Sequence, residues 1–257
     1  MADAPLLSLR GVCKSFGGVQ AVSSVTFDVH AGESVGLVGP NGAGKTTLFN
    51  CVCGQLRPEE GEIVFDGVPL DGLPTYKRAR LGIGRTYQKV EVFTDMSVQD
   101  HLMVAERARR GQGRLWRDLL NLSKPTREET ERVDAILELV GIAHLAGTSV
   151  NALGLGNCRL VEVARALATE PKILLADEPS SGLDLHETAE LAGVLRTVQR
   201  ERGTAVLLVE HDLAMVAEVV DRTVVMDLGA MLAEGTFDEV MADPAVRAAY
   251  LGEMGAV

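Results

Sequence analysis

Apolar residues follow two different patterns along this chain, and each pattern predicts a different kind of β-strand. Between Leu6 and Val29, apolar and polar positions alternate loosely, which is typical of antiparallel strands with one buried face. Three later runs are short and continuously apolar: Val35 to Val38, Ile173 to Ala176, and Ala205 to Val209. Such runs suit strands covered on both faces, as in a parallel sheet flanked by helices. We therefore expect an α/β protein with a mostly parallel core sheet and an antiparallel β subdomain.

The middle of the chain has the period of a helix. Apolar residues recur at helical spacing between residues 126 and 140. Thr126 and Glu129 can form a capping box, and Gly141 is a natural stop. The wider stretch from about Val98 to Leu167 is mostly helical in pattern and separates the first apolar run from the later ones, which predicts an inserted helical subdomain. The expected boundaries are a single domain at 6–253, a core lobe at about 6–88 and 170–253, and a helical lobe at about 89–169.

Composition narrows the class of protein. The 257 residues are 46% hydrophobic and 24% charged, which excludes a disordered or fibrous chain. The formal net charge of -11 repels phosphate backbones, so we expect no nucleic acid partner, and any bound anion must be held by a local site. No apolar run approaches the ~20 residues that cross a bilayer, which predicts a cytosolic or peripheral protein. The cysteines lack paired metal-ligand spacing, which favours reduced core residues: Cys13, Cys51, Cys53 and Cys158.

A glycine-rich segment after the first apolar run predicts a phosphate site. It fits the pattern G-x-x-x-x-G-K-[ST] and precedes a plausible helix. Glycines let a loop turn its N–H groups toward a phosphate, and the start of a helix adds positive potential. In this reading Lys45 bridges the β- and γ-phosphates of ATP, Thr46 gives its hydroxyl to Mg²⁺, and Thr47 reaches the next phosphate oxygen. The expected nucleotide-binding residues are Gly39, Pro40, Asn41, Gly42, Ala43, Gly44, Lys45, Thr46 and Thr47.

Two of the later apolar runs end in polar residues at the edge where α/β sheets bind ligands. Asp177 ends one run and is a candidate for holding Mg²⁺. Glu178 follows it and can orient or deprotonate the attacking water. His211 follows the other run and can contact the γ-phosphate, although a histidine taken alone is more often a surface residue.

The order of these motifs resembles that of the ATP-binding cassette (ABC) ATPases over nearly the whole chain. The further motifs of the resemblance are Gln88 as the glutamine loop, Leu153 to Asn157 as the signature loop, Gly182-Leu183-Asp184, and His211 as the switch histidine. The resemblance implies an ABC-type P-loop ATPase fold. It also implies that Phe16 stacks on adenine, the alternative being a core phenylalanine, and that Gln88 touches Mg²⁺ and the attacking water. The same resemblance implies that the ATP site of each cassette is completed by the other cassette. The signature loop and Asp184 of this chain would therefore contact ATP bound to the partner.

Within the family, the chain is similar to the ATPases of branched-chain (hydrophobic) amino acid importers. The segments that carry this similarity are 39–50, Arg85-Thr86-Tyr87-Gln88, the insertion after Ala105, Glu210-His211-Asp212, and 249–253. The resemblance implies a second ATPase subunit, two membrane permease subunits and, indirectly, a substrate-binding protein, with this chain at the cytoplasmic face of the membrane. The lipopolysaccharide export ATPase shares the Tyr-Leu-Gly-Glu ending, so a lipid transporter is the alternative. A soluble ABC ATPase outside transport is a further alternative.

The signature loop departs from the family pattern Leu-Ser-x-Gly-Gln. Gly154 replaces the serine and Asn157 the glutamine, while Leu153 and Gly156 are kept. We expect a helix from Arg159 to Ala168 after this loop. Loss of the serine hydroxyl removes a charge-assisted hydrogen bond of about 1.5–3 kcal/mol, which lowers affinity by roughly one to two orders of magnitude. We therefore hypothesise a heterodimer with one competent and one impaired ATP site.

The insertion after Ala105 is a basic, partly amphipathic island in an acidic chain. Leu115, Trp116, Leu119 and Leu120 lie among its cations. It can meet anionic lipid headgroups or a membrane subunit, and a simply solvated loop is an equal alternative. The cations are Arg107, Arg109, Arg110, Arg114, Arg117 and Lys124.

Overall fold

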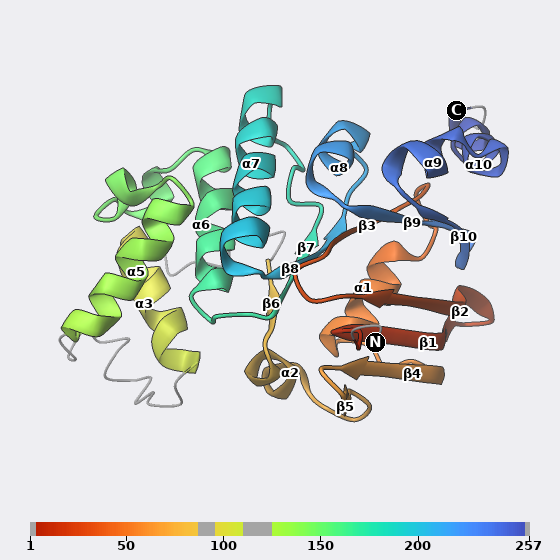
Figure 1. Cartoon of the computed structure of the whole chain (residues 1–257), viewed down its shortest axis with the longest axis horizontal. Helices are drawn as coiled ribbons and strands as arrows, with labels where there is room; N and C mark the ends of the chain where they lie inside the picture. Colours follow the sequence, from red (N-terminus) through yellow and green to blue (C-terminus); the bar gives the residue numbers. More distant parts are fainter. Residues whose placement is uncertain (1–3, 87–95, 110–124, 255–257) are drawn as a thin grey trace.

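The fold is built around two β-sheets, with the larger number of helices around the second one (Figure 1). It was obtained as a computed structural model that describes residues 4–86, 96–109 and 125–254. The first sheet has four strands in the order β2-β1-β4-β5 and is antiparallel throughout. Its strands are β1 (Leu7–Phe16), β2 (Val19–Val29), β4 (Glu60–Phe65) and β5 (Val68–Pro69). The alternation between Leu6 and Val29 thus predicted the right kind of strand.

The second sheet has six strands in the order β10-β9-β3-β8-β7-β6. All neighbouring strands in it are parallel except β10 and β9, which form an antiparallel pair. Its strands are β3 (Ser34–Val38), β6 (Ile83–Arg85), β7 (Ile173–Asp177), β8 (Ala205–Val209), β9 (Arg222–Asp227) and β10 (Ala230–Gly235). Every residue of β3, β7 and β8 is buried, as the continuously apolar runs predicted. The α/β class and the mostly parallel core sheet are therefore confirmed.

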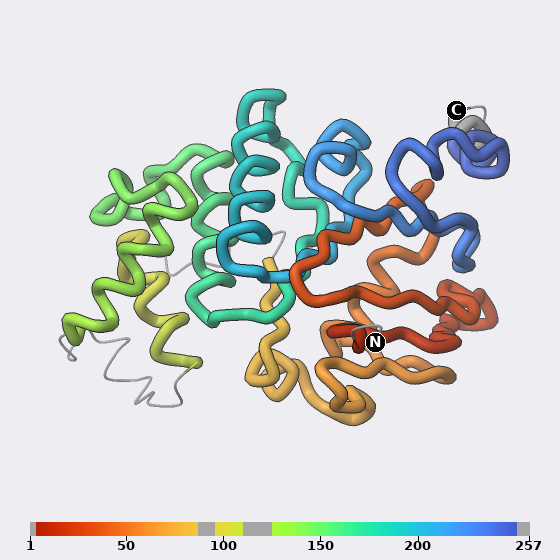
Figure 2. Tube along the Cα trace, viewed as in Figure 1, coloured from red at the N-terminus to blue at the C-terminus, as the bar shows by residue number. Residues whose placement is uncertain are grey.

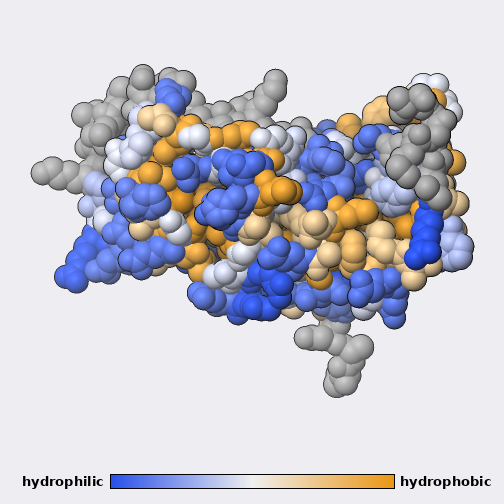
Figure 3. All heavy atoms as spheres, turned by 90° about the horizontal axis from the view of Figure 1, so that it is seen from above, coloured by the Kyte–Doolittle hydropathy of each residue, from blue (hydrophilic) through white to orange (hydrophobic). Residues whose placement is uncertain are grey.

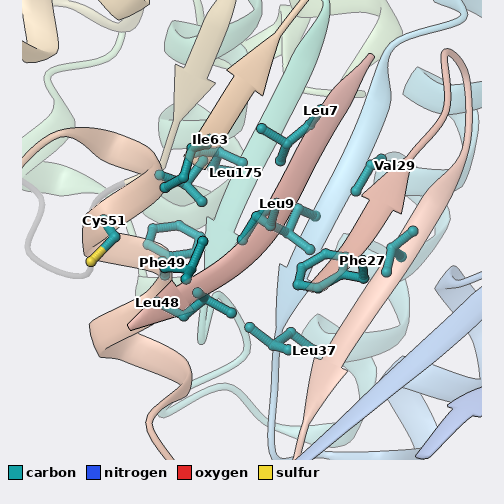
Figure 4. Packing of buried hydrophobic residues seen from close by; sticks show 14 of the residues in the cluster. Leu7, Leu9, Phe27, Val29, Leu37, Leu48, Phe49, Cys51, Ile63 and Leu175 are labelled. Atoms are coloured by element: carbon teal, nitrogen blue, oxygen red, sulfur yellow. The ribbon is translucent and has the colours of Figure 1, made fainter. Parts of the chain in front are cut away.

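Helices cover both faces of the core sheet (Figure 1). They are α1 (Lys45–Cys53), α2 (Thr75–Leu81), α3 (Val98–Arg109), α5 (Arg127–Leu139), α6 (Leu155–Leu167), α7 (Leu185–Arg202), α8 (Leu213–Val219), α9 (Phe237–Ala242) and α10 (Pro244–Met254). Short 3₁₀ turns lie at Ala143–Leu145 and Val150–Ala152. Helix α1 lies between the two sheets, where Leu48 and Phe49 pack against β1 and the core strands (Figure 4). This packing fixes the helix that follows the glycine-rich loop.

Side chains of β7 alternate between two apolar clusters. Ile173 and Leu175 pack in the cluster that contains α1 and the antiparallel sheet. Leu174 and Ala176 pack in a second cluster with α3, α5, α6, α7 and α8. Because successive side chains of a strand point to opposite faces, one strand serves both clusters.

The helical region between α3 and α6 agrees with the sequence pattern except at one boundary. Helix α5 has Thr126 as its N-cap, and the reciprocal capping box with Glu129 is present as predicted. Helix α6, however, begins at Leu155 rather than at Arg159, with Gly154 as its N-cap. Glycine is a poor helix former, so the sequence pattern placed this start too late. The signature loop is therefore the first turn of α6.

Both ends of the described chain lie in the half of the molecule opposite α3 and α5 (Figure 2). Seen from above, hydrophilic and hydrophobic residues alternate over the surface (Figure 3). Within the described ranges, no helix has the length and apolar character needed to cross a membrane. Two of the four thiols, those of Cys51 and Cys53, are fully buried, and burial raises their pKa values to about 11 and about 12. Such thiols stay protonated, as expected of reduced core residues.

Candidate nucleotide site

The ends of β3, β8 and β7 bring the predicted site residues to one edge of the core sheet. In the parallel register, Leu37 pairs with Val209, and Val209 pairs with Asp177. The glycine-rich loop starts two residues after Leu37, and His211 lies two residues after Val209. The carboxyl ends of parallel strands meet at a common edge, which is where α/β proteins bind ligands.

Two glycines of the loop hold backbone conformations that other residues resist. Gly44 is the N-cap of α1 with φ of 95°, in the left-handed region. A Cβ atom there would lie 2.1 Å from the carbonyl oxygen of Ala21 on β2. At Gly39 a Cβ atom would lie 2.0 Å from the carbonyl oxygen of Met226 on β9. The loop is thus packed tightly against strands on both sides, which fixes the start of α1.

Lys45 is held inside the loop. It is 7% exposed, and its Nζ donates to the carbonyl oxygens of Gly39 at 2.6 Å and Pro40 at 2.9 Å. The ammonium therefore already lies in the concave side of the loop, where phosphate oxygens would replace carbonyls as its acceptors. Thr46 is exposed and Thr47 is half-buried on the first turn of α1. Both threonines therefore lie in the first turn of the helix that follows the glycine-rich loop.

Asp177 is a buried carboxylate at the end of β7, with 3% exposure. Its Oδ2 lies 3.5 Å from Nη2 of Arg85, and its Oδ1 is buried with no hydrogen-bond partner among the described residues. Burial raises the pKa of Asp177, and the carboxylates of Glu178 and Glu210 add to the shift, while Arg85 opposes it. A buried oxygen without a donor is suited to a cation or to its bound water.

Glu178 and His211 take up less buried positions at the same edge. Glu178 is half-buried and has φ of 46°, a left-handed conformation that is unusual for a residue with a side chain. Such strain is typical of functional sites, because the surrounding structure must enforce it. His211 has a side chain that is 61% exposed, with Nδ1 3.5 Å from Oε2 of Glu210. Both side chains can therefore reach a ligand in front of the sheet edge.

Phe16 is the last residue of β1 and is 47% exposed. An exposed ring is available for stacking, which disfavours the alternative of a core phenylalanine. The Nζ of Lys14 lies 5.3 Å from the ring centroid, and it also pairs with Glu59 at 2.9 Å. Lys14 and Glu59 were not predicted as site neighbours, since their contact joins β1 to the residue just before β4, 45 positions along the chain.

The signature loop lies at the start of α6, next to the start of α7. Gly154 is exposed, and the N–H of Gly156 donates to Oε1 of Glu187 at 3.3 Å. Asp184 is the N-cap of α7, and it shares a reciprocal capping box with Glu187. Glu187 therefore joins the signature loop to Asp184. The D-x-x-E spacing from Asp184 to Glu187 is a local signal that could have indicated this capping box, whereas nothing local indicates the contact with Gly156.

The remaining predicted residues divide into two groups. Leu153 and Asn157 flank the start of α6 and are half-buried. Gln88 lies outside the described residues. Arg85 lies on β6, three strands away from β3 and its glycine-rich loop, and was missed as a site residue. Its guanidinium stands 4.8 Å from the ring centroid of Phe49 and donates to Oδ1 of Asn50 at 3.3 Å, so it connects α1 to Asp177.

A strand, a glycine-rich loop with a buried lysine, and an acidic end on another parallel strand of the same sheet define a P-loop nucleotide-binding protein. Residues 22–181 match the family described as ABC transporter. Residues 230–256 match the family described as branched-chain amino acid ATP-binding cassette transporter. The chain therefore belongs to the ABC transporter family, and it is an ATPase subunit that binds ATP.

Individual relatives match over almost the full chain. LivG of Escherichia coli strain K12, a high-affinity branched-chain amino acid transport ATP-binding protein, is 39% identical over 97% of this chain and 98% of LivG. LptB of Haemophilus influenzae, a lipopolysaccharide export system ATP-binding protein, is 36% identical over 96% of this chain and 98% of LptB. A crystal structure of an ABC transporter cassette in its ADP conformation has a TM-score of 0.86 at 30% identity and covers 98% of this chain and 100% of that chain.

Proposed function

We propose that this chain powers the import of branched-chain or other hydrophobic amino acids through separate membrane subunits. The observation that carries the proposal is the match of residues 230–256 to a family described by that cargo, together with full-length similarity to LivG. The matched segment consists of β10, α9 and α10, which pack on the far edge of the core sheet. The similarity to LptB makes lipopolysaccharide export the second candidate.

The proposed mechanism assigns one task to each residue at the sheet edge. Lys45 neutralises charge on the β- and γ-phosphates, while Thr47 and the loop N–H groups hold the phosphate oxygens. Glu178 orients the attacking water and accepts its proton as the water oxygen bonds to the γ-phosphorus and the bond to ADP breaks. His211 donates to the γ-phosphate, and Phe16 stacks on adenine.

Mg²⁺ fits the residues present, because Asp177 offers a buried oxygen without a donor. Asp177, Thr46 and Gln88 would hold the ion, which would neutralise charge on the β- and γ-phosphates of bound ATP. Thr46 supports this assignment because it is an exposed residue in the first turn of α1, directly after Lys45.

The signature half of the site would act in trans. Leu153, Gly154, Gly156, Asn157 and Asp184 would contact ATP held by a second cassette, and the start of α6 would face its γ-phosphate. Because Gly154 has no hydroxyl and α6 has no side-chain cap, the partner's ATP would be held more weakly. We therefore propose a heterodimer with one competent and one impaired site.

The proposed assembly places the chain at the cytoplasmic face of the membrane, on two permease subunits that receive cargo from a substrate-binding protein. ATP-driven closure of two cassettes would move the permeases, and hydrolysis would reset them. We retain the division into a core lobe and an inserted helical lobe at 89–169 as part of this proposal. Most of the basic insertion, residues 110–124, lies outside the described residues.

Leucine uptake by cells that lack this chain tests the proposal. Wild-type chain should restore saturable uptake of radiolabelled leucine, and the Glu178→Gln variant, which keeps nucleotide binding, should not. If neither restores uptake but wild type restores surface lipopolysaccharide, the second candidate is correct.

Co-purification from detergent-solubilised membranes should recover two permeases and a different cassette, and recovery of two identical cassettes would contradict the heterodimer.

A further inference from the structure

Glu210 is a buried carboxylate that has no task in the mechanism above. It follows β8 directly and stands between Val209 and His211 in the chain. Its exposure is 0%, although charged residues are rarely buried completely without partners. The cost of burying a carboxylate must be offset by hydrogen bonds to it. The donors of those hydrogen bonds identify the segments that Glu210 holds.

The two oxygens of Glu210 accept hydrogen bonds from two different loops. Oε1 accepts from the backbone N–H of Ser180 at 2.8 Å. Oε2 accepts from the backbone N–H groups of His211 at 2.9 Å and Asp212 at 3.3 Å. Ser180 belongs to the loop between β7 and α7, which contains Glu178 and ends at Asp184. The carboxylate therefore bridges the loop of Glu178 and the loop of His211.

The neighbouring backbone strengthens this bridge. The N–H of Glu178 donates to the carbonyl oxygen of Val209 at 2.8 Å, so two consecutive residues, Val209 and Glu210, hold the loop after β7. Nη2 of Arg159 on α6 also donates to the carbonyl oxygen of Ser181 at 3.2 Å. The loop after β7 is thus fixed on one side by Glu210 and on the other by the helix that starts at the signature loop.

We propose that Glu210 is a positioning residue for ATP hydrolysis, whose carboxylate holds the loops of Glu178 and His211 in one arrangement. The inference rests on the proposed roles of those two residues. Water activation and contact with the γ-phosphate must occur on the same nucleotide, so the spacing between the two side chains determines the rate. Small displacements of groups that orient reactants cost about 10²-fold in rate.

Only a carboxylate of this length can serve both loops. Glutamine has the same shape but one acceptor oxygen, so its NH₂ group would face an N–H donor of one loop. Aspartate keeps the charge but is shorter by one methylene and can reach only one loop. Glu210→Gln and Glu210→Asp should therefore act alike, although only one of them removes the charge.

ATP turnover and nucleotide affinity of the complex purified through a tag on this chain test the proposal. Glu210→Gln should lower kcat about tenfold to a hundredfold and leave the Kd for ATP within about twofold of wild type. Glu106→Gln is the matched control, because Glu106 is also buried, at 2% exposure, and pairs with Arg109 and Arg132 in the helical region. The control should keep wild-type kcat. Unchanged kcat in Glu210→Gln, or an equal fall in the control, would overturn the proposal.

Two further measurements keep the test decisive if Glu210→Gln folds poorly. In wild-type complex, the amides of Ser180, His211 and Asp212 should be protected from hydrogen exchange, and fast exchange at these amides would refute the bridge. In a His211→Ala background, Glu210→Gln should cost less than it does alone, and full additivity would refute positioning through His211. Glu178→Gln distinguishes a failure of the Glu210 proposal from a failure of the proposed ATP site. If Glu178→Gln retains full turnover, the proposed ATP site itself is wrong.

Discussion

The two halves of the proposed ATP site are built in contrasting ways. In the P-loop half, Lys45 is 7% exposed and held by two loop carbonyls, and Gly39 and Gly44, which precede it in the loop, pack against neighbouring strands. In the signature half, Gly154 is exposed at the start of α6, and among the described residues, its two chain neighbours aside, no atom lies within 4 Å of a Cβ built on it. The first half is organised by contacts within this chain, and in the proposed assembly the second would be completed by another subunit. Substitutions are therefore tolerated by the fold at Gly154 and resisted at Gly44.

The largest expected effect is the loss of hydrolysis without loss of binding in the P-loop half. Glu178→Gln keeps the shape of the side chain but cannot accept a proton, and general bases contribute about 10²–10⁴-fold to rate. We expect kcat to fall by about that factor while the Kd for ATP stays near wild type, measured by phosphate release and by binding of a fluorescent ATP analogue. Retention of more than half of the wild-type kcat would contradict the role of Glu178.

Gly44→Ala and Gly154→Ala compare the two halves with the same added methyl group. At Gly44 the methyl would collide with the carbonyl oxygen of Ala21 in a left-handed conformation, which strains the start of α1 by about 1–3 kcal/mol. At Gly154 the methyl meets open space at φ of −68°. We expect Gly44→Ala to weaken ATP binding about tenfold or more and Gly154→Ala to leave it unchanged, by equilibrium binding. Equal losses of ATP affinity in the two variants would contradict the difference between the P-loop half and the signature half.

Gly154→Ser sharpens the comparison by restoring the family's serine. The backbone at Gly154 is compatible with a side chain, and a hydroxyl there can donate to the partner's γ-phosphate. We expect turnover of the assembled complex to rise about tenfold or more, because one charge-assisted bond is worth about 1.5–3 kcal/mol and each ~1.4 kcal/mol is a factor of ten. Gly154→Ala is the control, since it adds bulk without a hydroxyl. If turnover is identical in wild type and Gly154→Ser, the missing hydroxyl does not limit the turnover of the complex.

The smallest expected effect concerns the helical region that carries the signature loop. Burial raises the pKa of Glu129, but its hydrogen bonds to Arg107 and Thr126 outweigh burial, so the net pKa is lowered. A lowered folded pKa stabilises the fold above the unfolded value of about 4.3, and this stability is lost as pH falls through the folded pKa. We expect Glu129→Gln to cost about 1 kcal/mol at pH 7 and less near pH 3, by urea unfolding. A constant difference between the two pH values would rule out this linkage.

Sequence reasoning located the elements and motifs well because their signals are local. Apolar runs gave β3, β7 and β8, and a contiguous motif gave the loop before Lys45. The contacts that hold the site in place were missed because they join residues far apart in the chain. Arg85 meets Asp177, Gly156 meets Glu187 and Ser180 meets Glu210 across 92, 31 and 30 positions. Such pairs depend on strand order and register, which one sequence does not reveal.

The start of α6 was misplaced for a related reason. Gly154 and Gly156 oppose a helix by propensity, and the pattern therefore favoured a later start. In the structure, the contact between Gly156 and Glu187 requires a residue without a side chain, since a Cβ atom would lie 2.7 Å from Oε1 of Glu187. Tertiary packing explains the glycine better than local preference does.

Strand β7 serves two apolar clusters at once, and this has a consequence for how the molecule unfolds. Leu174 and Ala176 belong to the cluster of the helical region, and Ile173 and Leu175 belong to the cluster around α1. When the helical region melts, one face of β7 loses its cover, and water reaches the strand that ends in Asp177. The clusters therefore form one cooperative unit, so calorimetry should detect a single transition and a protease that cuts the helices should also release the sheet.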